Sequence, residues 1–273
     1  IFFQNIEKTG IPERLPVFLY PKSCKFVKKS ERMRILTEVC ADNLNSAITA
    51  ERAGADRIEL CQGLSEGGLT PSPALIRWCS SNLKLGVMVL IRPRGGDFLY
   101  NDQEFEIIKE DVRFCRDAGA GGVVVGFLER DGSVDKEKLR EIVQIAGEME
   151  VVFHRAFDRC SDWEQALEDI IECGCVRILT SGLHDTAYEG RSFLREIIKR
   201  AGERIAILVG SGVVPLHVKE IYEATGFREV HFSAKRSAET EMRFQGKTIR
   251  PVKGHIETSP EETAEMLEIC AAL

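Results

Sequence analysis

Short runs of β-branched and other apolar residues recur along the chain, and each ends in polar or glycine residues before a stretch with helical periodicity. We predict eight strands from these runs: Ile35–Cys40, Asp56–Cys61, Leu85–Arg92, Gly121–Gly126, Val151–Arg155, Val176–Ser181, Ile205–Gly210 and Glu229–Ala234. A helix is predicted after every strand, the last over Pro260–Ala272. Strands that alternate with helices pair in parallel through crossover connections. Eight such units predict a single-domain α/β protein with the TIM (β/α)8 barrel fold, for which about 250 residues is typical.

The alternation of side chains within each run predicts which of them point into the barrel. In every strand the positions assigned to the surrounding helices are apolar. The inward positions near the carboxyl ends are polar or contain sulfur: Glu38, Cys40, Glu59, Cys61, Arg92, His154, Ser181, His231 and Ser233. Charge inside a barrel is costly unless it is paired or hydrated. Glu38, Glu59 and Arg92 could therefore form a buried ion network that only fixes the barrel. The alternative is a functional site, because His and Cys join them at the end where barrel enzymes act.

Composition narrows the class of protein and its partners. A net charge of −6, without zinc-finger spacing or an aromatic RNA-binding motif, argues against a nucleic-acid partner. No apolar run reaches the ~18 residues of a transmembrane helix, so no membrane association is expected. Nine cysteines, an odd number spread along the chain, indicate free thiols in a reducing cytoplasm.

The amino-terminal part of the chain differs from the rest. Residues 1–33 contain three prolines, scattered lysines and only short apolar stretches. We interpret them as an appended leader that need not be ordered, with a degraded targeting sequence as the alternative. Residues 34–273 are expected to form the barrel domain.

The sharpest local signal is a repeated pattern that contains cysteine. Glu38-Val39-Cys40 and Glu59-Leu60-Cys61 end adjacent predicted strands at matching positions. Neighbouring strands lie about 4.8 Å apart, so the two cysteines can come within disulfide reach or place two thiolates on one soft metal ion. Thiolates favour Cu(I), zinc or iron–sulfur clusters, and two sulfurs without an obvious third ligand suit Cu(I) best. The remaining interpretation is a pair of small thiols that fill the barrel mouth.

Two arginines follow the third strand, in the segment Ile91–Phe98. Arg92 and Arg94 are able to form bidentate contacts with a carboxylate or a phosphate. Alternatively, Arg92 is an internal counter-ion for Glu38 or Glu59, and the two roles do not exclude each other.

A histidine ends the fifth strand. His154 is a candidate general acid or base, with Glu38 or Glu59 as its partner in proton transfer. Asp158 is placed to orient His154 or to neutralise Arg155. The alternative is a hydrogen-bonded core histidine without a chemical role.

Glycine and serine residues follow the last three strands and are candidates for ligand binding. They are Ser181, Gly210, Gly212 and Ser233. Loops after the seventh and eighth strands of this fold commonly bind phosphate through backbone amides. Glycine turns are also ordinary connections in a barrel, so both interpretations stay open.

Several segments together resemble one protein family, the copper homeostasis protein CutC family. They are Glu38–Cys40, Gly54–Cys61, Gly63–Ser72, Ile91–Phe98, Phe153–Asp158 and Leu179–Gly182. The resemblance spans roughly residues 34–237, and Gly210-Ser211-Gly212 departs from the three glycines expected there. It implies a cytosolic, often oligomeric TIM barrel that acts in copper tolerance, storage or trafficking and binds Cu(I) at Cys40 and Cys61.

Two functions therefore remain in view, and the residues leave open whether the chain is an enzyme. The first is a cytoplasmic, homo-oligomeric Cu(I)-binding protein. The second is an enzyme that acts on a small anionic, sugar-like metabolite. In the second, Arg92 and Arg94 hold the anion, and Glu38 or Glu59 transfers protons together with His154.

Overall fold

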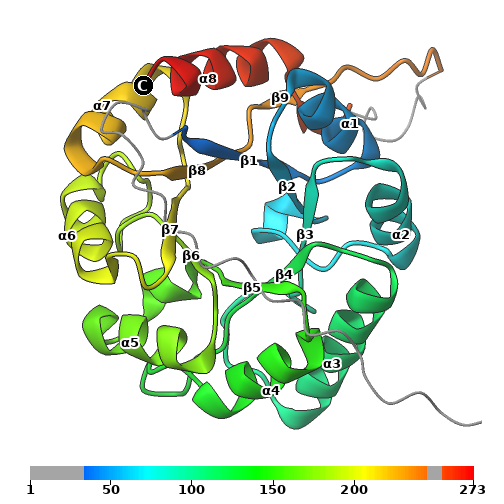
Figure 1. Cartoon of the computed structure of the whole chain (residues 1–273). Helices are drawn as coiled ribbons and strands as arrows, with labels where there is room; N and C mark the ends of the chain where they lie inside the picture. Colours follow the sequence, from blue (N-terminus) through cyan, green and yellow to red (C-terminus); the bar gives the residue numbers. More distant parts are fainter. Residues whose placement is uncertain (1–33, 245–253) are drawn as a thin grey trace, which may run out of the picture. The chain divides into compact units, whose positions relative to one another are not determined.

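Eight parallel strands close into one barrel in sequence order (Figure 1). The computed structural model describes residues 34–244 and 254–273, and the expected leader lies outside the described residues. The strands are β1 (Leu36–Ala41), β2 (Arg57–Leu60), β3 (Gly86–Leu90), β4 (Gly122–Val125), β5 (Glu150–Phe153), β6 (Arg177–Thr180), β7 (Ala206–Val209) and β8 (Glu229–Phe232). Because β8 pairs with β1, the sheet has no free edge. The predicted TIM-barrel fold is confirmed.

A helix follows each strand and packs on the outside of the barrel (Figure 1). The helices are α1 (Leu44–Ala53), α2 (Pro73–Asn82), α3 (Asp102–Asp117), α4 (Lys136–Ala146), α5 (Trp163–Cys173), α6 (Arg191–Ala201), α7 (Pro215–Thr225) and α8 (Pro260–Ala272). Local sequence explains their ends. Asn101 and Glu104 form a reciprocal capping box at the start of α3, and Gly174, with a φ of 95°, ends α5.

The observed strands differ from the predicted runs by at most two residues at either end. At the carboxyl rim the chain leaves the sheet earlier than predicted in every barrel strand except β1, which continues to Ala41. The Arg92 N–H, for example, donates to Thr70 Oγ1 (2.9 Å) instead of to a neighbouring strand. The short antiparallel pair of β9 (Lys235–Ser237) and β10 (Ile256–Thr258) was not predicted.

The predicted inward and outward faces of the strands are confirmed. Outward residues such as Val39, Ile58 and Val89 are buried in one apolar layer with the helices. Inward residues form a separate, smaller cluster: Cys40, Cys61, Met88, Leu90, Val124 and Val152. The barrel interior thus places sulfur and polar side chains below a rim where the loops begin.

A buried ion network fills the amino-terminal half of the barrel. Arg57 contacts Glu38 (2.6 Å between Nε and Oε2) and also Glu229. Arg177 contacts Glu229 (2.5 Å) and Glu150 (2.8 Å). These residues are inward in their strands, and the register aligns Glu38 with Arg57 directly. Glu38 therefore belongs to an ion network, but its cation is Arg57 and not the Arg92 that the sequence suggested.

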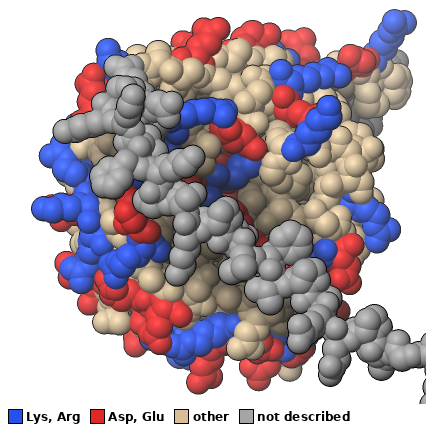
Figure 2. Space-filling view, in the orientation of Figure 1, with Lys and Arg blue, Asp and Glu red and all other residues tan. Residues whose placement is uncertain are grey.

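The outer surface carries charges of both signs, interspersed around the rim of the face in Figure 2. Within residues 34–244 and 254–273, no helix combines the length and the apolar character needed to span a membrane.

Candidate functional site

A cavity of about 850 Å³ opens among the loops that follow the strands. Its lining includes Cys40, Glu59, Cys61, Leu90, Arg92, Phe98, His154, Ser211, Gly212, His231 and Ser233. This volume lies in the range of sites for small organic molecules. The face is the one where barrel proteins place their chemistry.

Two cysteine thiols meet in the wall of this cavity. Cys40 Sγ lies 3.7 Å from Cys61 Sγ, and both thiols are free and buried. The expectation of matching positions needs correction, because Cys40 is in register with Glu59, two residues before Cys61. The tilt and stagger of barrel strands bring the sulfurs together despite this offset. The hydrogen bond with Cys61, together with burial, raises the pKa of Cys40 well above its ordinary value.

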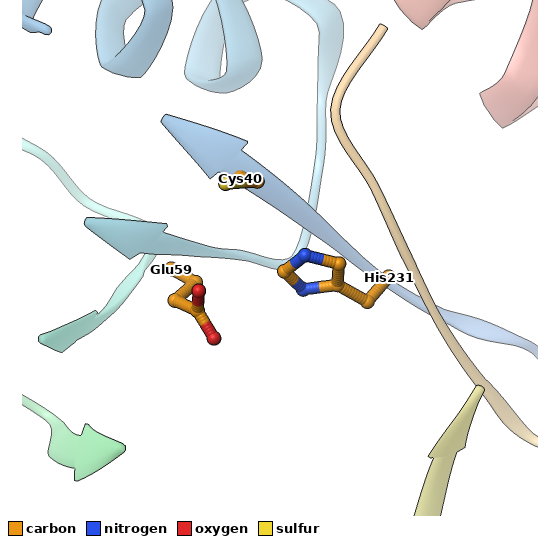
Figure 3. Close-up of side chains that lie close together, drawn as sticks. All are labelled: Cys40, Glu59 and His231. Carbon is orange, nitrogen blue, oxygen red and sulfur yellow. The ribbon is translucent and has the colours of Figure 1, made fainter. Parts of the chain in front are cut away.

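His231 and Glu59 lie beside this thiol pair. Ligand atoms of Cys40, Glu59 and His231 all fall within 4.8 Å of one another (Figure 3). His231 Nδ1 lies 2.8 Å from Glu38 Oε1, which fixes the ring. The sequence identified His231 as an inward residue but gave it no role. The sequence feature that could have revealed His231 is its place on the inward face of β8, which it shares with Glu229.

Glu59 and His231 in the cavity lining, with Glu38 beneath them, set the electrostatics of this part of the site. Burial disfavours the charged form of Glu38, but His231 and Arg57 outweigh it and lower the pKa of Glu38 to about 2. Burial raises the pKa of Glu59 to about 7, against the attraction of His231. Burial opposes protonation of His231, yet the neighbouring Cys40 and the carboxylates raise the pKa of His231 well above its ordinary value.

His154 directly follows β5 and lines the cavity. The Ala156 N–H donates to His154 Nδ1 (3.1 Å) at the start of the turn Arg155–Arg159. Burial, reinforced by the charge of Arg92, lowers the pKa of His154 to about 3. The ring is therefore neutral at physiological pH, and because Nδ1 accepts, its proton sits on Nε2. No partner of Nε2 exists among the described residues.

Arg92 is a buried cation that fastens two loops. Its terminal nitrogens donate to the carbonyls of Glu66 (2.6 Å), Gly68 (2.9 Å) and Gly96 (2.8 Å). No carboxylate of the described chain forms an ion pair with it. The expected internal pair with Glu38 or Glu59 is wrong, because loop carbonyls occupy the guanidinium and Arg57 serves Glu38.

Arg94 lies outside the cavity lining. Its guanidinium pairs with Glu104 (2.5 Å) and Asp97 (3.1 Å), and it donates to loop carbonyls such as that of Leu99 (2.8 Å). These contacts hold the loop between β3 and α3. We therefore assign Arg94 to loop structure and not to ligand binding.

Asp158 and Ser181 also lie outside the lining and contact each other. Asp158 Oδ2 accepts from Ser181 Oγ (2.9 Å) and from Arg155 Nε (2.8 Å). Of the two roles considered for Asp158, the structure shows the neutralisation of Arg155. The pair ties the turn after β5 to the end of β6.

Of the remaining predicted site residues, some line the cavity and others lie behind its lining. Gly212 and Ser233 line the cavity. Gly210 does not, and a Cβ at that position would lie 2.6 Å from Leu179 and 3.1 Å from His231. Glu38 is 1% exposed and lies beneath the cavity, so it reaches the site only through His231.

Comparison with known proteins places this architecture in a family. The model of the CutC family matches residues 35–236. The chain belongs to the CutC family. Every residue that lines the cavity falls inside the CutC match, since the lining extends from Cys40 to Ser233.

Relatives support this assignment across kingdoms. The copper homeostasis protein cutC homolog of Homo sapiens is 43% identical over 214 residues, 78% of this chain and 78% of the relative. A CutC family protein of Chromobacterium violaceum is 43% identical over 210 residues, 77% of this chain and 85% of the relative.

Solved structures agree with the barrel. A CutC crystal structure from Streptococcus agalactiae has a TM-score of 0.69 and 32% identity, and covers 72% of this chain and 97% of that one. Phosphoribosylanthranilate isomerase from Thermotoga maritima has a TM-score of 0.55 at 16% identity, covering 88% of this chain and 100% of that one. The latter likeness shows the shared fold alone.

Proposed function

We propose that this CutC-family protein binds Cu(I) through Cys40 and Cys61 and acts in copper homeostasis. The observation that carries the proposal is the 3.7 Å separation of the two buried sulfurs in the cavity wall. The names of its relatives, which refer to copper homeostasis, support the same role.

The donor set suits a soft ion. Thiolates select Cu(I), zinc or iron–sulfur clusters over harder cations. Metal–thiolate bonds of about 2.3 Å allow one ion to touch two sulfurs up to about 4.6 Å apart. Cys61 is 1% exposed, and its apolar neighbours Met88 and Leu90 keep water away from the pair. Such a setting favours a low-coordinate ion held mainly by sulfur.

His231 is the best third donor. Its Nδ1 faces Glu38, which leaves the other ring nitrogen for the cluster with Cys40. A carboxylate behind a ligating histidine fixes the ring and raises its basicity, an arrangement common in metal sites. Glu38 is thus a support for the donor and need not touch the metal.

The proposed Cu(I)–thiolate chemistry also bears on the cellular location of the protein. All eight cysteines that the structure describes are free thiols. Cu(I)–thiolate binding requires that they stay reduced, which supports a cytoplasmic location. The homo-oligomer implied by family resemblance stays a prediction, and light scattering of the purified protein would test it.

Titration of the reduced protein with Cu(I) against a competing chelator tests the proposal. We expect the double variant Cys40→Ala/Cys61→Ala to lose the tight copper equivalent. The control Cys173→Ala/Cys175→Ala removes another buried pair, at the end of α5, and should retain it. Unchanged affinity in the Cys40/Cys61 variant would place the copper site elsewhere and reject the proposal.

A further inference from the structure

Three buried polar atoms around the cavity lack a hydrogen-bond partner in the described chain. They are Glu59 Oε2, Arg92 Nε and His154 Nε2. Each of these residues is at most 6% exposed. Native proteins rarely leave buried polar atoms unpaired, because each one loses its hydrogen bonds with water. Three of them in the wall of one cavity indicate a partner that is not part of the chain.

The cavity also contains an uncompensated positive charge. Arg92 is buried and forms no ion pair with a described carboxylate. A buried cation of this kind is costly until an anion joins it. Copper held by Cys40 and Cys61 does not supply that anion.

Arg92 and His154 both line the cavity and lie beside the same aromatic ring. The Phe98 ring contacts both, with its centroid 5.3 Å from Arg92 Cζ and 4.8 Å from the His154 ring centroid. Because Nδ1 of His154 is engaged with the Ala156 amide, its Nε2–H is a donor. Arg92 Nε–H is a second donor, so the two together form an acceptor-binding pair.

The number of donors distinguishes between anions. Both terminal nitrogens of Arg92 are occupied by the carbonyls of Glu66, Gly68 and Gly96. Arg92 Nε and His154 Nε2 thus offer one hydrogen bond each, which matches the two oxygens of a carboxylate. A phosphate carries a third terminal oxygen and a second charge, which would need a further cation of the lining such as Arg159.

We propose that the cavity binds a small hydroxycarboxylate. Its carboxylate lies against Arg92 and His154, and one of its hydroxyl groups donates to Glu59. Ser211 and Ser233 in the lining offer further hydroxyl contacts, and the 850 Å³ volume accommodates such a molecule with water. This site uses neither cysteine, but Glu59 also lies beside Cys40 and His231, so the test below uses protein without metal.

Calorimetric titration of the metal-free protein with chosen probes tests the proposal. The hydroxycarboxylates are lactate, malate, tartrate and gluconate. Sorbitol has the six carbons and hydroxyls of gluconate without the carboxylate, and glucose 6-phosphate replaces the carboxylate with phosphate. We expect saturable binding of at least one hydroxycarboxylate and none of sorbitol. Absence of binding for all four hydroxycarboxylates, equal binding of sorbitol, or binding of glucose 6-phosphate alone would overturn the proposal.

Variants locate the binding in the cavity. His154→Phe keeps an aromatic ring beside Phe98 but removes the Nε2 donor, and Glu59→Leu removes the acceptor with a side chain of similar size. Each should weaken the bound hydroxycarboxylate about tenfold or more, the effect of losing one charge-assisted hydrogen bond. Arg94→Lys is the control, because Arg94 lies outside the lining and lysine keeps the positive charge. It should alter the affinity for the hydroxycarboxylate by less than about twofold. Circular dichroism checks that each variant is folded. Retained affinity in either folded variant, His154→Phe or Glu59→Leu, would contradict the assignment.

Discussion

Arg57 and Arg92 lie inside the barrel, yet their surroundings differ in kind. Arg57 is paired with Glu38 and Glu229, whereas Arg92 donates to loop carbonyls. The alternation of side chains along the strand correctly predicted that Arg92 points inward. It could not predict which group Arg92 contacts. The choice depends on strand register, which aligns Glu38 with Arg57.

Removing the Arg57 charge should strongly destabilise the fold. Arg57→Met leaves the carboxylates of Glu38 and Glu229 without their shared cation, and breaking a buried pair in this way costs about 3–5 kcal/mol. Arg34→Met, which breaks an exposed pair with Asp56, should cost at most about 1 kcal/mol. Urea denaturation of both variants measures the difference, and equal losses would show that the network does not stabilise the barrel.

His154 should make stability depend on pH. The unfolded chain protonates this histidine below its ordinary pKa of about 6.5, whereas burial and Arg92 keep the folded ring neutral down to about pH 3. The unfolded state therefore binds the extra proton, and stability falls as pH falls through this window, by up to about 1.4 kcal/mol per pH unit.

His154→Phe removes this dependence. Urea denaturation between pH 7 and pH 4 should give a curve for the variant that is flatter than that of the wild type, while the two stay parallel above pH 7. Parallel curves across the whole range would mean that folded His154 titrates normally.

At the scale of elements, strand β4 shows how a missing side chain shapes the site. A Cβ at Gly126, just after β4, would lie 2.3 Å from His154 Cε1 and 2.8 Å from the Ala156 Cβ. At Gly121, just before β4, the nearest atom is the Val87 carbonyl oxygen at 3.4 Å, an ordinary contact. The imidazole thus occupies the space that Gly126 leaves.

Gly126→Ala should therefore displace His154, with a cost of about 1–3 kcal/mol for overpacking. Gly121→Ala at the other end of the strand should change stability by less than about 0.5 kcal/mol. Thermal or urea unfolding of both variants provides the comparison. A tolerated Gly126→Ala would mean that His154 has room to move.

The elements that the sequence missed have weak patterns. The β9–β10 pair is short, and Lys235, Arg236 and Ser237 are all exposed, so no apolar alternation marks it. The turn Arg155–Arg159 begins where the predicted strand continued, because the His154 side chain accepts the Ala156 amide. Contacts of this local kind leave no periodic signal.

At the scale of the whole molecule, the number and order of the strands and their inward faces were predictable because each depends on local alternation. The composition of the site was predictable only in part. Glu38 and His231 lie 193 residues apart in the chain and meet only because β8 closes on β1. For the same reason the sequence pointed to Cys40 and Cys61 without pointing to His231, the proposed third donor.

X-ray absorption at the copper edge of the Cu(I)-loaded protein shows directly whether Cys40 and Cys61 ligate the ion. We expect scattering from two sulfur ligands, with one lighter donor from His231, and loss of the sulfur shell in Cys40→Ala/Cys61→Ala. A spectrum with nitrogen and oxygen ligands alone, or a sulfur shell that survives in the double variant, would contradict it.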